Sequence, residues 1–569
     1  MACSRRFLRS TPSLCLLGLA LAVAPLGGVA SGQAPIVVSP GFKLTPAGQD
    51  WFECSIAVSQ TNSNEALVMS CDTLPGAGFS YATILWGQSI ALGRTALGSL
   101  DVYAAPHPTD GTAWFTGVHA GDPSGTVVGW KNAGALSIQS GDQALIATSG
   151  LQDKPGIAVG VKPSTPTTIR HYVVRQKGQD GGCNNFHQHK SALSENAHLG
   201  PGSWSWNEHV VEPAPGSGSP CHFRGWGAGP VVLSTGRIVV VMGDEKSGPN
   251  WLYNDGKPYA VYSDDGIDWR PDYPTEPFVL VAPGSVVAPT TVNNNCQNTC
   301  PQAGCGGTPC GDTPYLADRR KNAPSIAVDR WAGIDDVYVA FYAKKSSSGS
   351  SNTDIIVCRG IQDDQGALTF PVILPDHLLH LTDSLLGLSP GEYGPDQFVP
   401  AIAVDSCGGV NLMFYDNRHD PDLTDAEEWV DVYYARIMGF GTANPVVQQW
   451  RLTPRSFRVD NLPTGFLGDY HNLSVSADGN TLYAAYIARD MADPENGPRT
   501  CYLHRINVNP CEGFLLDFNG DGTVNEDDTA VFLAAFDAKA PEADLNLDWT
   551  VDAEDLTLFL DWYASESAK

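Results

Sequence analysis

A short apolar segment recurs along the chain, and this internal repeat constrains the fold more than any other feature of the sequence. Each clear copy places Ile or Leu, a small residue and Val in a row. The copies lie at residues 55–59, 156–160, 325–329, 401–405 and 472–476, with a looser copy at 229–233. A supersecondary unit that repeats in this way is typical of radially stacked architectures, because each unit buries its apolar faces only against its neighbours.

A second apolar segment follows most copies after a turn, and several of these segments end in aromatic residues. The clearest lie at 337–342, 411–415 and 482–486. Short strands separated by turns rich in Gly and Pro indicate an all-β protein. We therefore expect a β-propeller of six or seven blades over residues 35–510. The alternative is a pair of β-sandwiches whose strands resemble one another by coincidence.

The C-terminal part contains a duplicated loop with the spacing of a calcium site. Loops 517–528 and 544–555 each carry oxygen-bearing side chains at positions 1, 3, 5, 9 and 12. This is the ligand spacing that Ca²⁺ uses in EF-hand-type loops, with a backbone carbonyl at position 7. The two copies match in register, and an apolar stretch follows each. The duplication predicts two bound calcium ions.

The pair of loops resembles a type I dockerin module, which attaches secreted proteins to cohesin receptors. The resemblance covers residues 511–565, and we assign 511–569 to this module. It implies a small helical EF-hand-like fold and a cohesin-like receptor or cell-surface scaffold as partner. The calcium ligands that it implies are Asp517, Asn519, Asp521, Thr523 and Asp528 in the first loop, and Asp544, Asn546, Asp548, Thr550 and Asp555 in the second.

Two features of the loops depart from the dockerin pattern. Trp549 stands at position 6 of the second loop, where glycine allows a sharp turn. Positions 10 and 11 are not the small hydroxyl residues that help cellulosomal dockerins choose a cohesin. We expect two short helices after the loops, whose apolar faces pack together because neither is stable alone. These faces comprise Val531, Phe532, Ala535 and Phe536, and Leu556, Phe559, Leu560 and Tyr563.

The N-terminus has the pattern of a secretory signal peptide. Arg5, Arg6 and Arg9 precede an apolar run at 14–26, and small residues at 28–30 suit cleavage. The run is too short to span a membrane, so we expect bacterial export of the chain to the extracellular space or cell surface, with residues 1–30 removed and no transmembrane anchor.

The cysteine count agrees with export. Of 14 cysteines, two lie in the signal peptide, and the remaining even number suggests disulfides. Proximity suggests the pairs Cys54–Cys71 and Cys501–Cys511. Two local disulfides also fit the four cysteines at 296–310 better than zinc does, because their spacing lacks paired CxxC units.

The formal net charge of −28 disfavours nucleic acid as a partner. Phosphate binding requires clustered Lys and Arg, whereas acidic residues outnumber basic ones here.

The segment 263–269, Ser-Asp-Asp-Gly-Ile-Asp-Trp, fits the Asp-box pattern. With similar phrases near 323–329, 414–418 and 467–470, it resembles sialidase-like BNR-repeat proteins across most of residues 50–508. The resemblance implies a propeller in which this turn joins two strands of a blade. It does not imply sialidase activity, because Arg is scarce and no arginine triad can be assigned.

Candidate funnel residues follow or precede the repeated strands. They are Asp416, Arg418, Asp469 and Tyr470. Their carboxylates could act as acid and base in glycoside hydrolysis or bind Ca²⁺; alternatively, Asp416 and Arg418 form a structural ion pair and Asp469 caps a turn. We expect a propeller that binds or acts on glycan in polysaccharide breakdown, as a glycoside hydrolase if it is an enzyme. The alternative is a non-catalytic structural or protein-binding propeller.

Overall fold

The computed structural model of the 569-residue chain describes most of the propeller and part of the C-terminal region. The described residues are 36–74, 78–120, 125–147, 152–163, 165–178, 187–199, 201–210, 225–244, 258–270, 279–280, 324–331, 335–344, 353–362, 367–371, 378–381, 385–386, 395–422, 427–442, 445–462, 467–468, 470–508, 526–539, 543, 545 and 550–567.

Seven antiparallel sheets form the blades of a propeller. Blade one contains β3 (Trp51–Val58), β4 (Glu65–Asp72), β5 (Ser80–Leu85) and β6 (Ser89–Arg94). Blade two contains β7 (Leu100–Pro106), β8 (Ala113–His119), β9 (Gly125–Lys131) and β10 (Gln143–Ala147). Blade three contains β11 (Gln152–Lys162), β12 (Thr165–Gly178), β13 (His187–Ser194) and β14 (Ser205–Val210). The short 3-10 helices η1 (Ser140–Asp142), η2 (Ala197–Leu199) and η3 (Pro201–Ser203) lie in connections.

The remaining blades follow the same order from the first strand outward. Blade four contains β15 (Gly225–Val232), β16 (Ile238–Asp244), β17 (Tyr259–Ser263), β18 (Trp269–Arg270) and β19 (Val279–Leu280). Blade five contains β20 (Ser325–Asp329), β21 (Asp336–Lys344), β22 (Thr353–Gln362), β23 (Leu368–Thr369) and β24 (Leu378–Leu381). Blade six contains β25 (Gln397–Val404), β26 (Val410–Asp416), β27 (Trp429–Met438), β28 (Val446–Arg451) and β29 (Phe457–Arg458).

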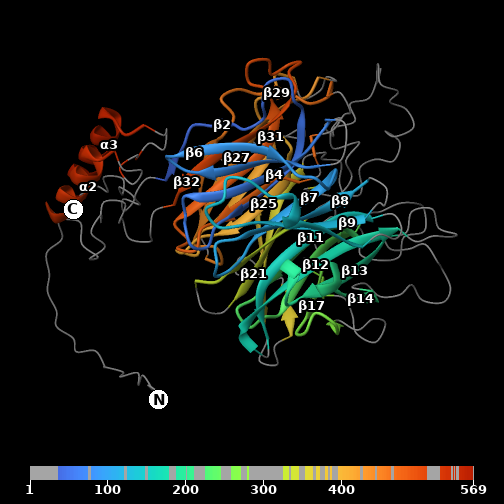
Figure 1. Ribbon diagram of the computed structural model, residues 1–569. Helices are drawn as coiled ribbons and strands as arrows, with labels where there is room; N and C mark the ends of the chain where they lie inside the picture. Colours follow the sequence, from blue (N-terminus) through green and yellow to red (C-terminus); the bar gives the residue numbers. More distant parts are fainter. Residues whose placement is uncertain are drawn as a thin grey trace, which may run out of the picture.

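Blade seven closes the ring with strands from both ends of the chain. It joins β30 (Asn472–Val475), β31 (Thr481–Arg489) and β32 (Arg499–Asn507) to β1 (Val37–Val38) and β2 (Phe42–Lys43). Figure 1 shows the blue N-terminal β2 beside the red β32, with which it pairs. The first strand of each blade contacts the first strand of the next, and β30 contacts β3. The first strands therefore surround the central axis, and the number of blades is seven.

The repeated segments form strands, as the sequence predicts, and the structure places them innermost in their blades. The copies at 55–59, 156–160, 325–329, 401–405 and 472–476 begin on or within β3, β11, β20, β25 and β30, and the looser copy begins on β15. The aromatic segments form the second strands β21, β26 and β31. The innermost strand of blade two, β7, lacks the apolar signature and was not predicted.

Serines of the repeat connect neighbouring blades. The Ser55 hydroxyl accepts a hydrogen bond from the Ala104 backbone N–H at 2.9 Å, and the Ser325 hydroxyl accepts one from the Ile402 N–H at 3.2 Å. An innermost strand has one edge without a partner strand, and a buried N–H on that edge is costly unless it is hydrogen-bonded. The serines satisfy such groups and fix each blade against the next.

The turn at 263–269 joins β17 and β18, and a carboxylate within it accepts backbone hydrogen bonds. One oxygen of Asp265 accepts the Ile267 N–H at 2.7 Å and the Asp268 N–H at 2.8 Å. Partial burial raises the pKa of the Asp265 carboxyl, but these N–H bonds outweigh burial and the pKa falls below its ordinary value. Trp269 packs against a cluster that includes Tyr172 of blade three, so the turn contributes to the contact between two blades.

The two C-terminal helices begin at the same position of the duplicated loop. α2 (Glu526–Asp537) and α3 (Ala553–Ser567) start at position 10 of the first and second copies. Phe532 and Phe559 occupy matching places in the two copies and stack with ring centres 4.0 Å apart. The predicted contact between the helices is therefore present. The predicted faces were wrong in part: Val531 and Leu560 are exposed, because each lies directly before or after the buried phenylalanine on its helix.

The expected disulfides of the described cysteines are not formed. Cys54, Cys71 and Cys501 are free and buried, which rules out both predicted pairs in this structure. Cys54 lies opposite Ser70 in the β3–β4 ladder, so the next residue, Cys71, directs its side chain to the other face of the sheet. Cys407 is disulfide-bonded. The four cysteines at 296–310 lie outside the described residues.

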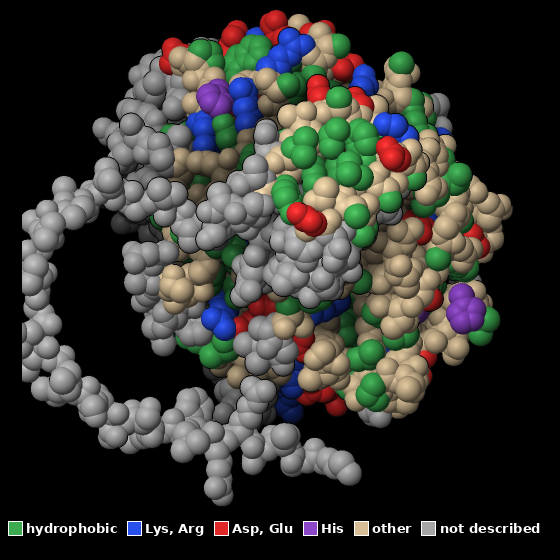
Figure 2. Space-filling model, turned by 90° about the vertical axis from the view of Figure 1, so that its left-hand side faces the viewer, with side chains coloured by type: hydrophobic (Ala, Val, Ile, Leu, Met, Phe, Trp, Pro, Cys, Tyr) green, Lys and Arg blue, Asp and Glu red, His purple; other side chains and the backbone are tan. Residues whose placement is uncertain are grey.

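The described surface mixes charges of both signs. Figure 2 shows acidic and basic side chains interspersed with hydrophobic ones on the face that it presents. Within the described ranges, no helix combines the length and apolar character needed to cross a bilayer.

Candidate functional site

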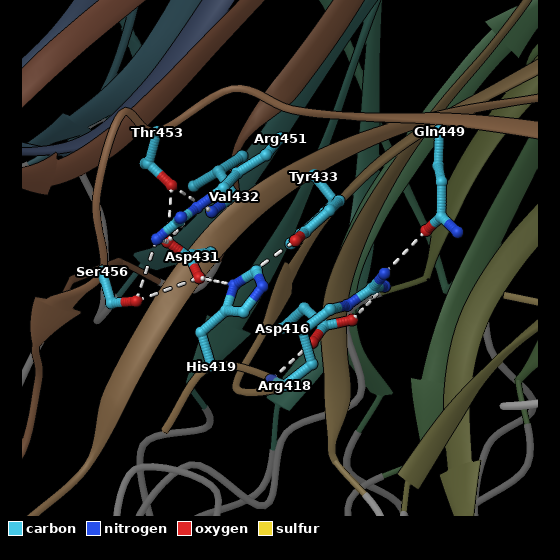
Figure 3. Close-up of polar contacts among 10 residues, drawn as sticks. All are labelled: Asp416, Arg418, His419, Asp431, Val432, Tyr433, Gln449, Arg451, Thr453 and Ser456. Atoms are coloured by element: carbon cyan, nitrogen blue, oxygen red, sulfur yellow. Dashed lines mark hydrogen bonds and ion pairs between the residues drawn. The ribbon is translucent and has the colours of Figure 1, made fainter. Parts of the chain in front are cut away.

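Blade six holds the first two candidate residues from the sequence, Asp416 and Arg418 (Figure 3). Asp416 is the last residue of β26 and is completely buried. One of its oxygens accepts the Arg418 backbone N–H at 2.7 Å, and the other accepts Arg418 Nη2 at 2.6 Å. Burial raises the pKa of Asp416 above its ordinary value, although the bonds from Arg418 oppose that shift. Asp416 and Arg418 therefore form an ion pair, as expected if their role is structural.

Arg418 also connects Asp416 to the neighbouring strands. Its Nη1 donates to Gln449 Oε1 at 2.8 Å, and its guanidinium carbon lies 3.9 Å from the centre of the Tyr433 ring. Its Nε is buried and has no hydrogen-bond partner among the described residues. The guanidinium is thus held by two strands and an aromatic face, which fixes its position.

A histidine–aspartate pair lies beside this ion pair and was not predicted. His419 Nδ1 lies 2.8 Å from Asp431 Oδ2, and the His419 side chain is 44% exposed while that of Asp431 is fully buried. The Tyr433 hydroxyl lies 3.4 Å from the same Nδ1 (Figure 3). Asp431 sits on β27 and His419 in the connection from β26 to β27. The sequence contains no local motif for this pair, because His419 and Asp431 are twelve positions apart.

Tyr470, the third described candidate, belongs to a different part of the propeller. Its hydroxyl donates to the Val102 carbonyl of blade two at 3.0 Å, and Lys154 Nζ of blade three lies 5.6 Å from its ring centre. Asp469 lies outside the described residues. The structure therefore separates Tyr470 from the Asp416–Arg418 pair and directs it toward the central axis.

The lysine near Tyr470 binds two carboxylates from successive blades. Lys154 Nζ forms ion pairs with Asp101 Oδ1 and, at 3.2 Å, with Glu53 Oε1. Glu53 Oε2 accepts the Asp101 backbone N–H at 3.3 Å. These three residues, which we name the axial charge cluster, are 1–7% exposed. They join the innermost strands of blades one, two and three around the axis.

Each member of the axial charge cluster occupies a bulge in its strand. The ladders shift register at these positions, and the backbone φ is 49° at Glu53, 54° at Asp101 and 42° at Lys154. A non-glycine residue in this left-handed region costs about 1–2 kcal/mol. Val399 of blade six has the same conformation, with φ 49°, at a bulge of β25. The bulge itself therefore does not require a charged side chain.

Alignment of the repeats could have found most of this cluster. Glu53, Lys154, Val399 and Tyr470 each lie two positions before the start of a repeat copy. A position that is apolar in one copy and charged or aromatic in others marks a place where the blades differ at the axis. Asp101 could not be found in this way, because β7 lacks the repeat.

The predicted calcium loops lie mostly outside the described residues. Of the predicted ligands, Asp528, Thr550 and Asp555 are described; Asp517, Asn519, Asp521, Thr523, Asp544, Asn546 and Asp548 are not. Asp528 and Asp555 are both completely buried at equivalent positions, near the starts of α2 and α3. Asp555 accepts the Leu545 N–H at 2.7 Å and the Asp552 N–H at 2.9 Å. Within the described part of the chain, no group of three or more His, Cys, Asp or Glu side chains could hold a metal.

The chain is only weakly similar to proteins of known structure. No protein-family model matches the sequence, and no curated protein matches it. Among solved structures, the GH93 α-L-arabinofuranosidase of Fusarium graminearum in complex with arabinobiose is 9% identical, with a TM-score of 0.34 and coverage of 83% of this chain and 98% of that one. A lectin of Aleuria aurantia is 10% identical, with a TM-score of 0.35 and coverage of 71% and 97%. A neuraminidase-like protein of A/flat-faced bat/Peru/033/2010 (H18N11) is 9% identical, with a TM-score of 0.32 and coverage of 84% and 97%.

Proposed function

We propose that this chain is a secreted glycan-binding propeller that a calcium-binding, dockerin-like module tethers to a cohesin-like receptor or cell-surface scaffold. The observation that carries the glycan-binding part is the axial charge cluster. Three innermost strands accept backbone strain to bring Glu53, Asp101 and Lys154 together. Strain of this kind gathers at binding and catalytic positions, where the surrounding fold compensates for it.

The chemistry of the cluster suits sugar hydroxyl groups. Carboxylate oxygens accept hydrogen bonds from hydroxyls, and the ammonium of Lys154 donates them. The Tyr470 ring beside Lys154 offers an apolar face on which a sugar ring can stack. An acidic sugar is a poor fit, because its carboxylate would be placed beside those of Glu53 and Asp101.

The same contacts favour binding over hydrolysis by the carboxylate pair. A glycosidase of that kind needs one carboxyl as a proton donor and the other as a nucleophile or base. Here Lys154 forms ion pairs with both Glu53 and Asp101, so the two carboxyl groups are joined by one cation instead of flanking a space for a glycosidic bond.

Support for the tether comes from the C-terminal helices. The calcium-type spacing of the two loops coincides with helices that begin at the same loop position and carry equivalent buried carboxylates, Asp528 and Asp555. In the proposed module, the two ions neutralise part of the acidic segment 517–569 and fix the helices as a binding surface. Secretion through the N-terminal signal peptide places the module where calcium is abundant and a receptor is accessible.

The test is calorimetric titration of the full secreted chain with neutral oligosaccharides (xylohexaose, arabinohexaose and cellohexaose) and with the acidic trigalacturonate and sialyllactose. We expect at least one neutral oligosaccharide to bind and the acidic ones not to bind. Asp101→Asn and Lys154→Met should weaken binding at least tenfold. Lys131→Met is the matched control, because Lys131 forms another buried ion pair, with Glu65, away from the bulges. Absence of neutral-sugar binding, or equal loss in the control, would contradict the proposal.

A further inference from the structure

The His419–Asp431 pair of blade six is built as an oriented histidine with a buried carboxylate behind it. His419 Nδ1 contacts Asp431 Oδ2 at 2.8 Å. Among the described residues, no hydrogen bond engages Nε2, and the side chain is 44% exposed. A carboxylate on one ring nitrogen fixes the tautomer and the orientation of the imidazole, which leaves the other nitrogen able to accept a proton.

Asp431 is held more firmly than a surface ion pair requires. Its Oδ1 accepts Arg451 Nε at 3.0 Å and Nη2 at 2.7 Å, and also the Thr453 hydroxyl at 2.8 Å. Its Oδ2 accepts the Ser456 hydroxyl at 3.1 Å in addition to His419 (Figure 3). Arg451 alone would compensate the charge of Asp431. The further donors fix the direction of its lone pairs, and through them the position of the imidazole.

Two side chains, Tyr433 and Arg418, lie beside the exposed imidazole of His419. The Tyr433 hydroxyl lies 3.4 Å from His419 Nδ1, and the Arg418 guanidinium stacks on the Tyr433 ring. Arg418 is a buried cation whose Nε–H has no hydrogen-bond partner among the described residues. A buried N–H donor without a partner is costly, so its presence beside an oriented histidine points to a ligand.

The pair also lies on the same face of the propeller as the axial charge cluster. Asp416, three positions before His419, pairs with Gln397 at the start of β25. Glu53, Asp101 and Lys154 lie near the starts of β3, β7 and β11. Because all innermost strands of a propeller run in one direction, their starts share one face. A glycan bound at the axis can therefore extend toward blade six.

We propose that His419, positioned by Asp431, is a general base that hydrolyses acyl esters carried by the bound glycan. His419 Nε2 takes a proton from water while the water oxygen forms a bond to the acyl carbon. The bond from that carbon to the sugar oxygen then breaks, and the imidazolium returns the proton to the sugar oxygen. The products are a carboxylic acid and a free sugar hydroxyl, and His419 is again neutral.

An acyl ester is the favoured substrate class because addition of water to an acyl carbon requires only proton transfer by one oriented base, which the imidazole of His419 can provide. Cleavage of a glycosidic bond instead requires a pair of carboxyl groups flanking that bond. Among the described residues, His419 contacts Asp431 and Tyr433, and these in turn contact Arg451 and Arg418; the two carboxyl groups of this network, Asp431 and Asp416, are both buried and form no exposed pair. This inference rests on the proposed glycan binding, which supplies the substrate.

The first experiment measures acetate release from acetylated xylan oligosaccharides and from p-nitrophenyl acetate by the full chain. We expect His419→Gln to lower kcat/KM by about 100-fold or more. Asp431→Asn should lower kcat with little change in KM and alter the pH profile, as expected for a positioning residue. His198→Gln is the matched control, because His198 is exposed and lies in η2. Hydrolysis no faster than that of His419→Gln would overturn the inference.

A second measurement does not depend on turnover or on the folding of the Asp431 variant. Diethyl pyrocarbonate modification, followed by mass spectrometry, reports the reactivity of each histidine. We expect His419 to react faster than His198, and Tyr433→Phe to change only the rate at His419. Equal reactivity of the two histidines would count against the inference. Glycan binding by the natural chain is measured in parallel: absence of binding contradicts the proposed function, whereas binding without ester hydrolysis contradicts only this inference.

Discussion

Three histidines of the propeller lie in its interior, where burial disfavours the charged imidazolium. His171, His471 and His504 are buried, and burial lowers their pKa to about 3, about 4 and about 4. Both ring nitrogens of His504 have partners: Nδ1–H donates to the Ser39 carbonyl at 2.8 Å, and Nε2 lies 3.0 Å from the Tyr486 hydroxyl.

We therefore expect the free energy of unfolding to fall as the pH falls from about 6.5 to about 4. In this window the unfolded histidines bind protons and the folded ones do not, so acid favours the unfolded state. Above about pH 6.5 both states are neutral and the full stability is present. A shift of one pKa unit corresponds to about 1.4 kcal/mol, so each of His471 and His504 accounts for roughly 3 kcal/mol across the window.

Urea unfolding at several pH values measures this effect through its slope. His504→Gln should lower the number of protons bound on unfolding by about one, whereas His198→Gln, at an exposed site, should lower it less. A slope that His504→Gln leaves unchanged would show that His504 does not remain neutral in the folded chain.

Among structural elements, the repeated innermost strand was the most predictable from sequence. Its apolar signature places the strands correctly in most blades, because a strand buried on both faces must be apolar along its length. The innermost strand of blade two was not predicted, because β7 reads Leu-Asp-Val-Tyr-Ala-Ala-Pro and has the charged Asp101 at its bulge. The axial charge cluster and the His419–Asp431 pair could not be predicted for a different reason. Their members are distant in sequence, and only the closure of the ring or the pairing of strands brings them together.

The contact between innermost strands predicts the effect of removing a serine hydroxyl. Ser325→Ala should lower the free energy of unfolding by about 1–3 kcal/mol, because the Ile402 N–H loses its acceptor in the interior. Ser137→Ala, at an exposed serine, is the control and should change it by less than about 0.5 kcal/mol. Chemical denaturation of the two variants provides the comparison, and equal stabilities would refute the role of the serine.

The helical pair gives a prediction for calcium. If the loops bind Ca²⁺, the ion should protect the connection between α2 and α3 from proteolysis, because each ion then holds the ligands of its loop together. Trypsin cleavage after the exposed Lys539 reports this directly. Calcium should slow the cleavage at least tenfold relative to a chelator, and Asp528→Asn with Asp555→Asn should abolish the protection.

Asp537→Asn is the control for this experiment, because Asp537 is exposed at the end of α2 and is not a predicted ligand. Protection that calcium does not change in the natural chain would contradict calcium binding by these loops. Glycan affinity should be independent of calcium, so the two halves of the proposed function can fail separately.

At the scale of the whole molecule, the ring is closed by pairing the two ends of the propeller. β1 and β2 pair with β32, and the Leu44 N–H bonds the Cys501 carbonyl at 2.9 Å. Arg499 forms an ion pair with Asp50 at 2.5 Å and stacks on Phe52. These contacts join opposite ends of the propeller sequence, with 449 positions between Asp50 and Arg499, and so close the ring.

Deletion of residues 36–43 should therefore be more damaging than deletion of the whole helical pair. The first change exposes the outer edge of β32 in blade seven, and an unpaired strand edge promotes aggregation. The second change, a stop after residue 510, leaves all seven sheets intact. We expect the shortened N-terminal variant to unfold at a lower temperature and to form oligomers, and the variant that ends at 510 to keep the melting temperature of the propeller. Calorimetry and size-exclusion chromatography measure both effects. Equal behaviour of the two variants would show that closure by β1 and β2 does not stabilise the ring.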